Sequence, residues 1–264
     1  MLAEIAVYIA SLPRAPAPYR RHLSDAIGLW ARGQRQRKAW APHREATKAV
    51  IVEAMSKLPS HRTAAILGSG PLFDVPIEAI SARFERVLLL DIAHLATISQ
   101  RLAPLANVER VWRDLAPPGQ AEPLAFLNDM PQLDWVVSVN LLSQLARAAP
   151  DGTERATIDR HLDGLSKMPV PVTLVTDTGY RVLDRAGREL EAFDLLYGRT
   201  LPRPASKWNW EVAPFGEESP RSQRIHTVFA YPEWPKAEDL VLPRSSSRVR
   251  RADPVAQQDR AQDS

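Results

Sequence analysis

The chain has 264 residues, 45% of them hydrophobic and 25% charged, a balance typical of a globular protein rather than a disordered or membrane-spanning one. This length allows one large core. No run of eighteen apolar residues occurs, so no membrane-spanning helix is expected. The absence of cysteine excludes disulfides, thiolate metal ligands and a cysteine nucleophile. The first stretch, MLAEIAVYIASLPRAPAP, has Glu4 where a secretory signal carries Lys or Arg. We therefore expect a short helix here, and a cytoplasmic protein without membrane contact.

The formal net charge of +3 is unevenly distributed, because residues 14–48 hold nine Lys and Arg against Asp25 and Glu45. With Trp30 and Trp40 interleaved, this segment could bind nucleic acid through phosphate neutralisation and base stacking. Alternatively, Leu23, Ile27 and Trp30 form the apolar stripe of an amphipathic helix that packs on the rest of the protein. The second interpretation is favoured, since helical spacing needs no ligand to explain it.

Further along the chain, the pattern predicts a helix over 41–58 and then five short apolar strands separated by helices. The strands are expected at 63–68, 86–92, 108–112, 134–140 and 170–178, with helices at 76–84, 95–105 and 154–166. Parallel strands need crossover connections, and strands buried on both faces are almost wholly apolar. The sequence therefore predicts a doubly wound, mostly parallel α/β sheet of Rossmann-like type with an N-terminal helical extension.

After residue 180 the pattern changes to a charged helix over 184–198, a loop rich in Pro and Trp, and one late strand over 224–232. The last residues are polar with few apolar side chains. We expect a helical preface over 1–60 that covers the site, one cofactor-binding domain over 61–240, and a disordered tail over 241–264.

Four consecutive strand ends carry residues suited to ligand binding. The first strand runs into Gly68-Ser69-Gly70, the second ends at Asp91, the third at Asp114 and the fourth at Asn140. In an open parallel sheet, ligands bind at the carboxyl ends of the strands, where the winding direction reverses. Glycines allow a tight turn and close ligand approach, and a carboxylate about twenty residues further on can bind ribose hydroxyls, although it can also cap a helix.

The ligand suggested by this edge has one ribose and no phosphate. A dinucleotide fingerprint requires a third glycine where Phe73 stands, and no phosphate-binding loop with Gly-Lys-Ser/Thr is present. S-Adenosylmethionine fits this description.

Four stretches, AILGSGPLFDVP, RVLLLDIAHL, VWRDLA and DWVVSVNLLSQL, occur in an order that resembles the class I S-adenosylmethionine-dependent methyltransferases, over roughly residues 60–235. The resemblance implies a seven-stranded sheet in which strand 224–232 inserts antiparallel beside the fifth strand. It also implies roles for individual residues. Gly68, Ser69 and Gly70 would contact the amino acid part of the cofactor, and Asn140 would lie near its methionine portion. Asp91 and Ile92 would bind the ribose. Asp114 and Leu115 would lie at the adenine edge.

Two positions depart from the family pattern: Ile66 stands where an acidic residue is usual, and Leu72 where a third glycine often occurs. Asp74 is a candidate replacement for the missing carboxylate. Two alternatives to methyl transfer stay open. One is an inactive binding or regulatory protein, which could be RNA-associated, and the other is aminoalkyl transfer from the same cofactor, because GSGPL also resembles the loop of nicotianamine synthases.

The acceptor is expected to be a small molecule, with a macromolecule as the alternative, and neither its identity nor the oligomeric state follows from the sequence. Transfer requires alignment of a nucleophile, plus a base when that nucleophile is a hydroxyl. The candidate catalytic residues are His43, Asp177 and Tyr180, and the candidate substrate wall is Trp40, Trp208 and Trp210. No metal site is expected, since the six histidines lack metal-binding spacing.

Overall fold

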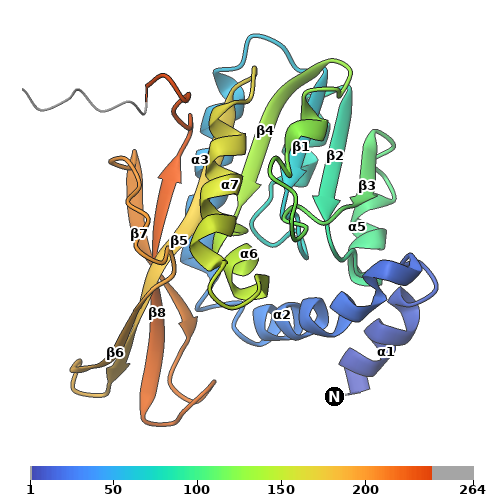
Figure 1. Cartoon of the computed structure of the whole chain (residues 1–264). Helices are drawn as coiled ribbons and strands as arrows, with labels where there is room; N and C mark the ends of the chain where they lie inside the picture. The colour runs from blue at the N-terminus through green and yellow to red at the C-terminus, as the bar shows by residue number, and fades with distance from the viewer. Residues whose placement is uncertain (1, 240–264) are drawn as a thin grey trace, which may run out of the picture.

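The computed structural model describes residues 2–239, which form one mixed sheet with helices on both faces (Figure 1). The expected tail over 241–264 lies outside the described residues. The strand order is β3-β2-β1-β4-β5-β8-β7, and β6 pairs only with β5. The strands are β1 (Thr63–Leu67), β2 (Arg86–Asp91), β3 (Val108–Trp112), β4 (Leu133–Val139), β5 (Val172–Asp184), β6 (Glu189–Asp194), β7 (Ser206–Ala213) and β8 (Ser222–Tyr231).

The first five strands are parallel, and the winding direction reverses between β1 and β4. The late strand β8 inserts antiparallel between β5 and β7. This confirms the doubly wound sheet and the antiparallel insertion predicted from the sequence. Seven strands form the main path as expected, and β6 is an eighth.

Alternate residues of the central strands face two separate cores. Ala64 and Ile66 pack with α3 (Ala41–Ser56) and α4 (Ile77–Ser81), whereas Ala65 and Leu67 pack with α6 (Leu142–Ala148) and α7 (Glu154–Ser166). All residues of β1 and β4 are buried. Burial on both faces explains why these strands are continuous apolar runs rather than alternating ones.

The predicted crossover helix over 95–105 is much shorter than expected. It consists of a 3-10 turn, η2 (Ala96–Ile98), and one turn of helix, α5 (Ser99–Leu102). Pro104 lacks the N–H that a continuing helix would need at that position. A further 3-10 turn, η3 (Ala125–Leu127), precedes β4.

The prediction of a charged helix over 184–198 is wrong. In the structure β5 continues to Asp184, a tight turn follows, and β6 returns antiparallel. Asp184 Oδ1 accepts the N–H groups of Ala186 and Arg188, and Gly187 has φ +79°. The residues of β6 favour a helix, but all of them are exposed, so a helix here would have no apolar face to bury. The segment forms a strand because β5 supplies partners for its backbone hydrogen bonds.

The segment expected to be a Pro- and Trp-rich loop contains the strand β7, which also corrects the sequence prediction. Its side chains alternate, so Trp208 and Trp210 share a face. Helix α3 packs against β5, β7 and β8 on that side of the sheet. The distal parts of β5 and β8, together with β6, extend beyond the helices that cover the sheet (Figure 1). We call residues 178–194 and 222–227 the arm.

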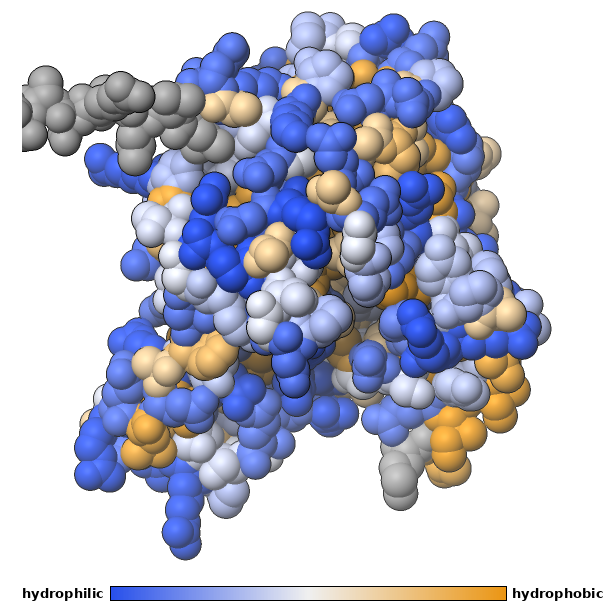
Figure 2. Space-filling view, viewed as in Figure 1, coloured by the Kyte–Doolittle hydropathy of each residue, from blue (hydrophilic) through white to orange (hydrophobic). Residues whose placement is uncertain are grey.

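The N-terminal helices are α1 (Leu2–Ser11), η1 (Ala17–His22) and α2 (Leu23–Arg35), and α2 runs across the lower edge of the sheet (Figure 1). Leu23 and Ile27 are buried as predicted, in a small cluster with Leu95, and Trp30 is partly buried. Helix α1 exposes Leu2, Ile5 and Ile9, seen as the apolar patch at the lower right of Figure 2. Among residues 2–239, no helix combines the length and apolarity needed to cross a bilayer.

Candidate functional site

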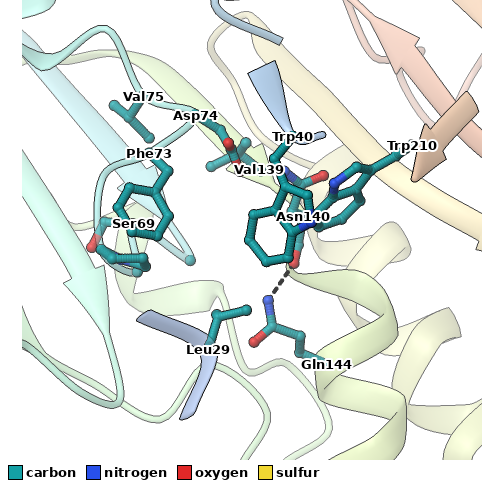
Figure 3. A pocket seen from close by; sticks show the side chains of 13 residues that line it. Leu29, Trp40, Ser69, Phe73, Asp74, Val75, Val139, Asn140, Gln144 and Trp210 are labelled. Atoms are coloured by element: carbon teal, nitrogen blue, oxygen red, sulfur yellow. Dashed lines mark hydrogen bonds between the residues drawn. The ribbon is translucent and has the colours of Figure 1, made fainter. Parts of the chain in front are cut away.

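A pocket lies at the carboxyl edge of the sheet, where the strand order reverses between β1 and β4. Its empty volume is about 440 Å3, solvent-open mouth included. It is lined by the loop after β1, the end of β4, one side chain each from α2 and α6, and two tryptophans (Figure 3). Crevices at this position are the usual ligand sites of doubly wound sheets. The lining residues are Leu29, Trp40, Gly68, Ser69, Gly70, Pro71, Phe73, Asp74, Val75, Val139, Asn140, Gln144 and Trp210.

The two glycines after β1 have different reasons to be glycine. Gly68 has φ +74°, and a Cβ there would meet Leu141 Cβ at 2.8 Å, so packing against the next loop excludes a side chain. Gly70 has φ +48°, and the only atom within 4 Å of an added Cβ is Gly68 O, at 4.0 Å. Gly70 therefore combines a left-handed backbone with open space beside it, which is what close approach of a ligand requires.

Asp91 connects the loops that follow β1 and β2. Its Oδ2 accepts the N–H of Gly70 at 2.7 Å, and its Oδ1 accepts the N–H of Ala93 at 3.0 Å. Each carboxylate oxygen keeps a second lone pair, so Asp91 can still accept hydrogen bonds from a ligand. Neither Asp91 nor the adjacent Ile92 lines the pocket itself.

A polar network extends from the pocket into the protein. Asn140, with φ +48°, donates from Nδ2 to Asp74 Oδ2 at 2.8 Å. Asp74 Oδ1 and Asn140 Oδ1 are both buried without a hydrogen-bond partner among the described residues, and so is Ser69 Oγ. Buried acceptors are normally satisfied, so these oxygens are suited to a ligand that brings N–H or O–H donors.

His43, a candidate catalytic residue, is buried and held from several sides. The indole N–H of Trp208 donates to His43 Nδ1 at 3.1 Å, and because an indole can only donate, the proton of the neutral ring must be on Nε2. Of the two neighbours of that nitrogen, Asp74 Oδ2 at 3.7 Å can accept its proton, whereas Asn140 Nδ2 at 3.0 Å is itself a donor and cannot. His43 therefore offers no free lone pair to a substrate.

Aromatic rings form one wall of the pocket. His43 stacks on Trp210 at 4.0 Å between ring centroids, and Trp40 meets Trp210 edge to face at 5.0 Å. Trp40 donates its indole N–H to Val212 O at 3.1 Å. In Figure 3 the two indoles lie together beside Asn140, with Leu29 and Gln144 below them in this view and Phe73 and Ser69 to the left. Of the three predicted wall residues, Trp40 and Trp210 line the pocket and Trp208 does not.

Asp177 and Tyr180 lie on β5, beyond its parallel part. Asp177 is buried, and its Oδ2 lies 2.8 Å from His226 Nδ1 on β8. Tyr180 stacks beside His226 at 5.5 Å and donates its hydroxyl to Glu191 Oε1 at 2.6 Å. This hydrogen bond raises the pKa of Tyr180, which keeps the phenol protonated. His226 was not singled out from the sequence.

The end of β3, where the sequence predicts the adenine edge, contacts the N-terminal segment. Asp114 Oδ1 accepts the N–H of Ala116, and Leu115 is buried. Tyr19 lies against Trp112 at 6.0 Å, the last residue of β3. Asp114 and Leu115 lie outside the pocket lining, so the structure brings together only part of the predicted cofactor set. The predicted residues found in the lining are Gly68, Ser69, Gly70, Asp74, Asn140, Trp40 and Trp210.

An ionic clamp joins α2 to the turn between β7 and β8. Glu217, in that turn, binds Arg35 at 2.7 Å, Gln36 at 2.6 Å and Arg32 at 3.5 Å. The hydrogen bond from Arg35 lowers the pKa of Glu217. Arg44 of the same basic segment donates to Gly33 O and covers the Phe73 ring. Several of the cations counted in residues 14–48 are thus engaged within the fold.

Among residues 2–239, no three His, Asp or Glu side chains converge as a metal site requires. Sequence reasoning missed Leu29, Phe73 and Gln144 as lining residues, because their positions depend on packing between distant segments.

The chain matches no protein-family model and no curated protein. Among solved structures it is similar to the N-methyltransferase NodS from Bradyrhizobium japonicum in complex with S-adenosyl-L-homocysteine, with 16% identity over 72% of this chain and 87% of that chain and a TM-score of 0.39. It is also similar to the 1,6-didemethyltoxoflavin-N1-methyltransferase from Burkholderia thailandensis, with 12% identity over 81% and 90% of the two chains and a TM-score of 0.42.

A third similar structure is the DhpI complex with S-adenosylhomocysteine, with 15% identity, coverage of 86% of this chain and 97% of that chain, and a TM-score of 0.37. The fold itself follows from this chain's own strand order. With β8 antiparallel between β5 and β7, it is the class I methyltransferase fold expected from the sequence resemblance.

Proposed function

We propose that this chain is an S-adenosylmethionine-dependent methyltransferase that acts on a small molecule and holds the cofactor against the loop after β1. The observation that carries the proposal is a pair of buried acceptor oxygens, Asp74 Oδ1 and Asn140 Oδ1, which have no hydrogen-bond partner among residues 2–239 and belong to a pocket at the topological switch point. Acceptors without donors suit a ligand that carries ammonium and hydroxyl groups.

Electrostatics favour a cationic ligand over a phosphorylated one. Two carboxylates, Asp74 and Asp91, flank the glycine loop. Helix α4, the next helix after this loop, begins only at Ile77 and has five residues, so no long helix presents its N-terminus to a phosphate there. S-Adenosylmethionine carries an ammonium and a sulfonium and no phosphate, so it fits these charges better than a dinucleotide.

Individual residues would hold the cofactor as the resemblance implies. Gly68, Ser69 and Gly70 would contact its amino acid part. Asp74 would supply the carboxylate that the family usually has at the position of Ile66. Asp91 and Ile92 would lie at the ribose, Asp114 and Leu115 at the adenine, and Asn140 at the methionine portion.

When bound, the cofactor supplies a methyl group activated by its sulfonium. The protein's part is to orient the acceptor and exclude water, because the leaving group needs no further activation. Trp40, Trp210 and Leu29 form an apolar wall suited to that task. His43 accepts the Trp208 N–H at Nδ1 and stacks on Trp210, and it would hold the wall in place.

Calorimetry with S-adenosylhomocysteine tests the proposal. We expect micromolar binding to the full chain and at least a tenfold loss in Asp74→Asn, in which an acceptor becomes a donor, and in Asp91→Ala. Asp129→Asn, on an exposed loop away from the pocket, is the control and should bind like the wild type. If the folded wild-type chain binds neither the methyl donor nor its product, the proposal is wrong.

The same measurement separates the alternatives. Salt-sensitive binding of single-stranded RNA without cofactor binding would favour an RNA-associated protein. Engagement of Arg32, Arg35 and Arg44 within the fold weakens that alternative. Aminoalkyl transfer would leave methylthioadenosine, and methyl transfer leaves S-adenosylhomocysteine, so product chromatography distinguishes the two reactions.

A further inference from the structure

A histidine–carboxylate pair lies beside the pocket, built from two antiparallel strands. Asp177 on β5 is 4% exposed, and its Oδ2 is 2.8 Å from Nδ1 of His226 on β8. The His226 side chain is 13% exposed, so the ring is largely buried but still reaches solvent.

The contact with Asp177 fixes which nitrogen of His226 carries the proton. An ionised carboxylate only accepts hydrogen bonds, so Nδ1 is the donor and the neutral ring has its lone pair on Nε2. In the part of the chain that the structure describes, no hydrogen bond to His226 Nε2 is found. This is the opposite tautomer from His43, whose Nδ1 accepts from Trp208.

The strand register places His226 on the pocket side of the sheet. Trp210, His226 and Tyr180 are direct cross-strand partners on β7, β8 and β5, so their side chains emerge on the same face. Trp210 lines the pocket, and its ring centroid is 5.9 Å from that of His226. Tyr180 stacks on the imidazole from the other neighbouring strand.

We propose that His226, oriented by Asp177, is the general base of the reaction and that the acceptor is an aromatic compound with a hydroxyl group. This inference rests on the proposed methyl transfer. His226 Nε2 takes the hydroxyl proton as the oxygen bonds to the methyl carbon, and the electron pair of the broken sulfur–carbon bond returns to sulfur. A neutral hydroxyl is a poor nucleophile until its proton leaves, so a base held by a carboxylate has a function there.

The acceptor class follows from the neighbours of His226. The rings of Trp210 and Tyr180 flank the imidazole. Because Trp210 also stacks on His43 and Tyr180 also stacks on Phe193, they offer a planar acceptor edge contacts. Tyr180 cannot replace His226 as the base because its own hydroxyl proton is donated to Glu191.

Long-range 1H–15N NMR of the full chain labelled with 15N-histidine tests the proposal. Signals are assigned with His226→Gln, and His22→Gln serves as the control for a histidine on η1. We expect the uncharged ring of His226 to be in the Nδ1–H form, and we expect Asp177→Asn to lower the population of that form. Predominance of the Nε2–H form in the wild type would overturn the proposal.

A second measurement tests whether His226 faces the transferred group. The probes are S-adenosylhomocysteine and sinefungin, in which a primary amine extends from the methyl position. We expect the His226 Nε2 signal to differ between the two complexes, while the His22 signals do not. If both probes bind and His226 does not distinguish them, His226 is not the base. If neither probe binds, the proposed methyltransferase function fails first, whatever the tautomer.

Discussion

His43 and His226 both contact the indole of Trp210, but they differ in every contact that determines the chemistry of a histidine. His43 is stacked on the ring, fully buried, and accepts a hydrogen bond at Nδ1. His226 meets the ring at an angle of 63°, keeps some exposure, and lies at Nδ1 beside a carboxylate. Nearness to a pocket therefore says little about the role of a histidine, whereas the partner of each nitrogen says much.

The largest expected effect distinguishes the two residues by stability. His43→Gln should lower the free energy of unfolding by about 3 kcal/mol, because it removes a buried ring and leaves the Trp208 N–H without its acceptor. His226→Gln retains a donor for Asp177 and should cost about 1 kcal/mol or less. Urea unfolding of both variants measures the difference. Equal or reversed costs would contradict the structural role given to His43.

A third histidine shows what burial alone does. His161, on α7, is fully buried beside Ser138, and burial lowers its pKa from 6.5 to about 4. Between these two pH values His161 is protonated in the unfolded chain but not in the folded chain, so stability is lost as the pH falls from 6.5 towards 4. The loss should reach about 2 to 3 kcal/mol.

Unfolding experiments between pH 7 and 4 on the wild type and His161→Gln measure this contribution. The difference between the two proteins should shrink as the pH falls. A difference that does not change with pH would show that folding leaves the pKa of His161 unchanged.

Trp208→Phe should have a smaller effect on stability, and it should change the surroundings of His43 but not those of His226. It removes the N–H that fixes the tautomer of His43 but keeps most of the ring volume, so we expect a loss of about 1 kcal/mol. The 15N signals of His43 should change and those of His226 should not. Trp30→Phe on α2, a partly buried tryptophan away from both histidines, is the matched control. A change at His226 as large as at His43 would mean that the two environments are not separate.

Much of the sheet could be predicted from the sequence because its central strands are buried on both faces. Strands β1, β2 and β4 are continuous apolar runs with little competing interpretation. The arm was not predictable in the same way. Strand β6 is fully exposed and rich in helix-favouring residues, and only its pairing with β5, a long-range event, makes it a strand.

The residues of the candidate site also differ in whether their positions could be predicted from the sequence. Gly68, Gly70 and Asn140 follow directly from the ends of strands, so their convergence could be predicted. His226 could not be paired with Asp177 without the antiparallel register of β5 and β8. The alternation of Arg224, His226 and Val228 on one face of a strand was the available signal, but it did not indicate what that face would meet.

The smallest expected effect concerns the connection between α2 and the turn before β8. Because Arg35 lowers the pKa of Glu217, the clamp contributes stability above the ordinary pKa of 4.5, and the contribution is lost as the pH falls through the lower value of the folded protein. Arg35 is about half exposed, so solvent screening limits the contribution to about 0.5 to 1 kcal/mol. Glu217→Gln should therefore be less stable than the wild type at pH 7, and the two should converge as the pH falls below the lowered pKa of Glu217. Glu109→Gln, which breaks a pair that is exposed on both sides, should show a smaller difference at pH 7. If Glu217→Gln and the wild type have the same stability at every pH, α2 is held over the pocket by its apolar contacts alone, and the clamp does not link it to the strand that carries His226.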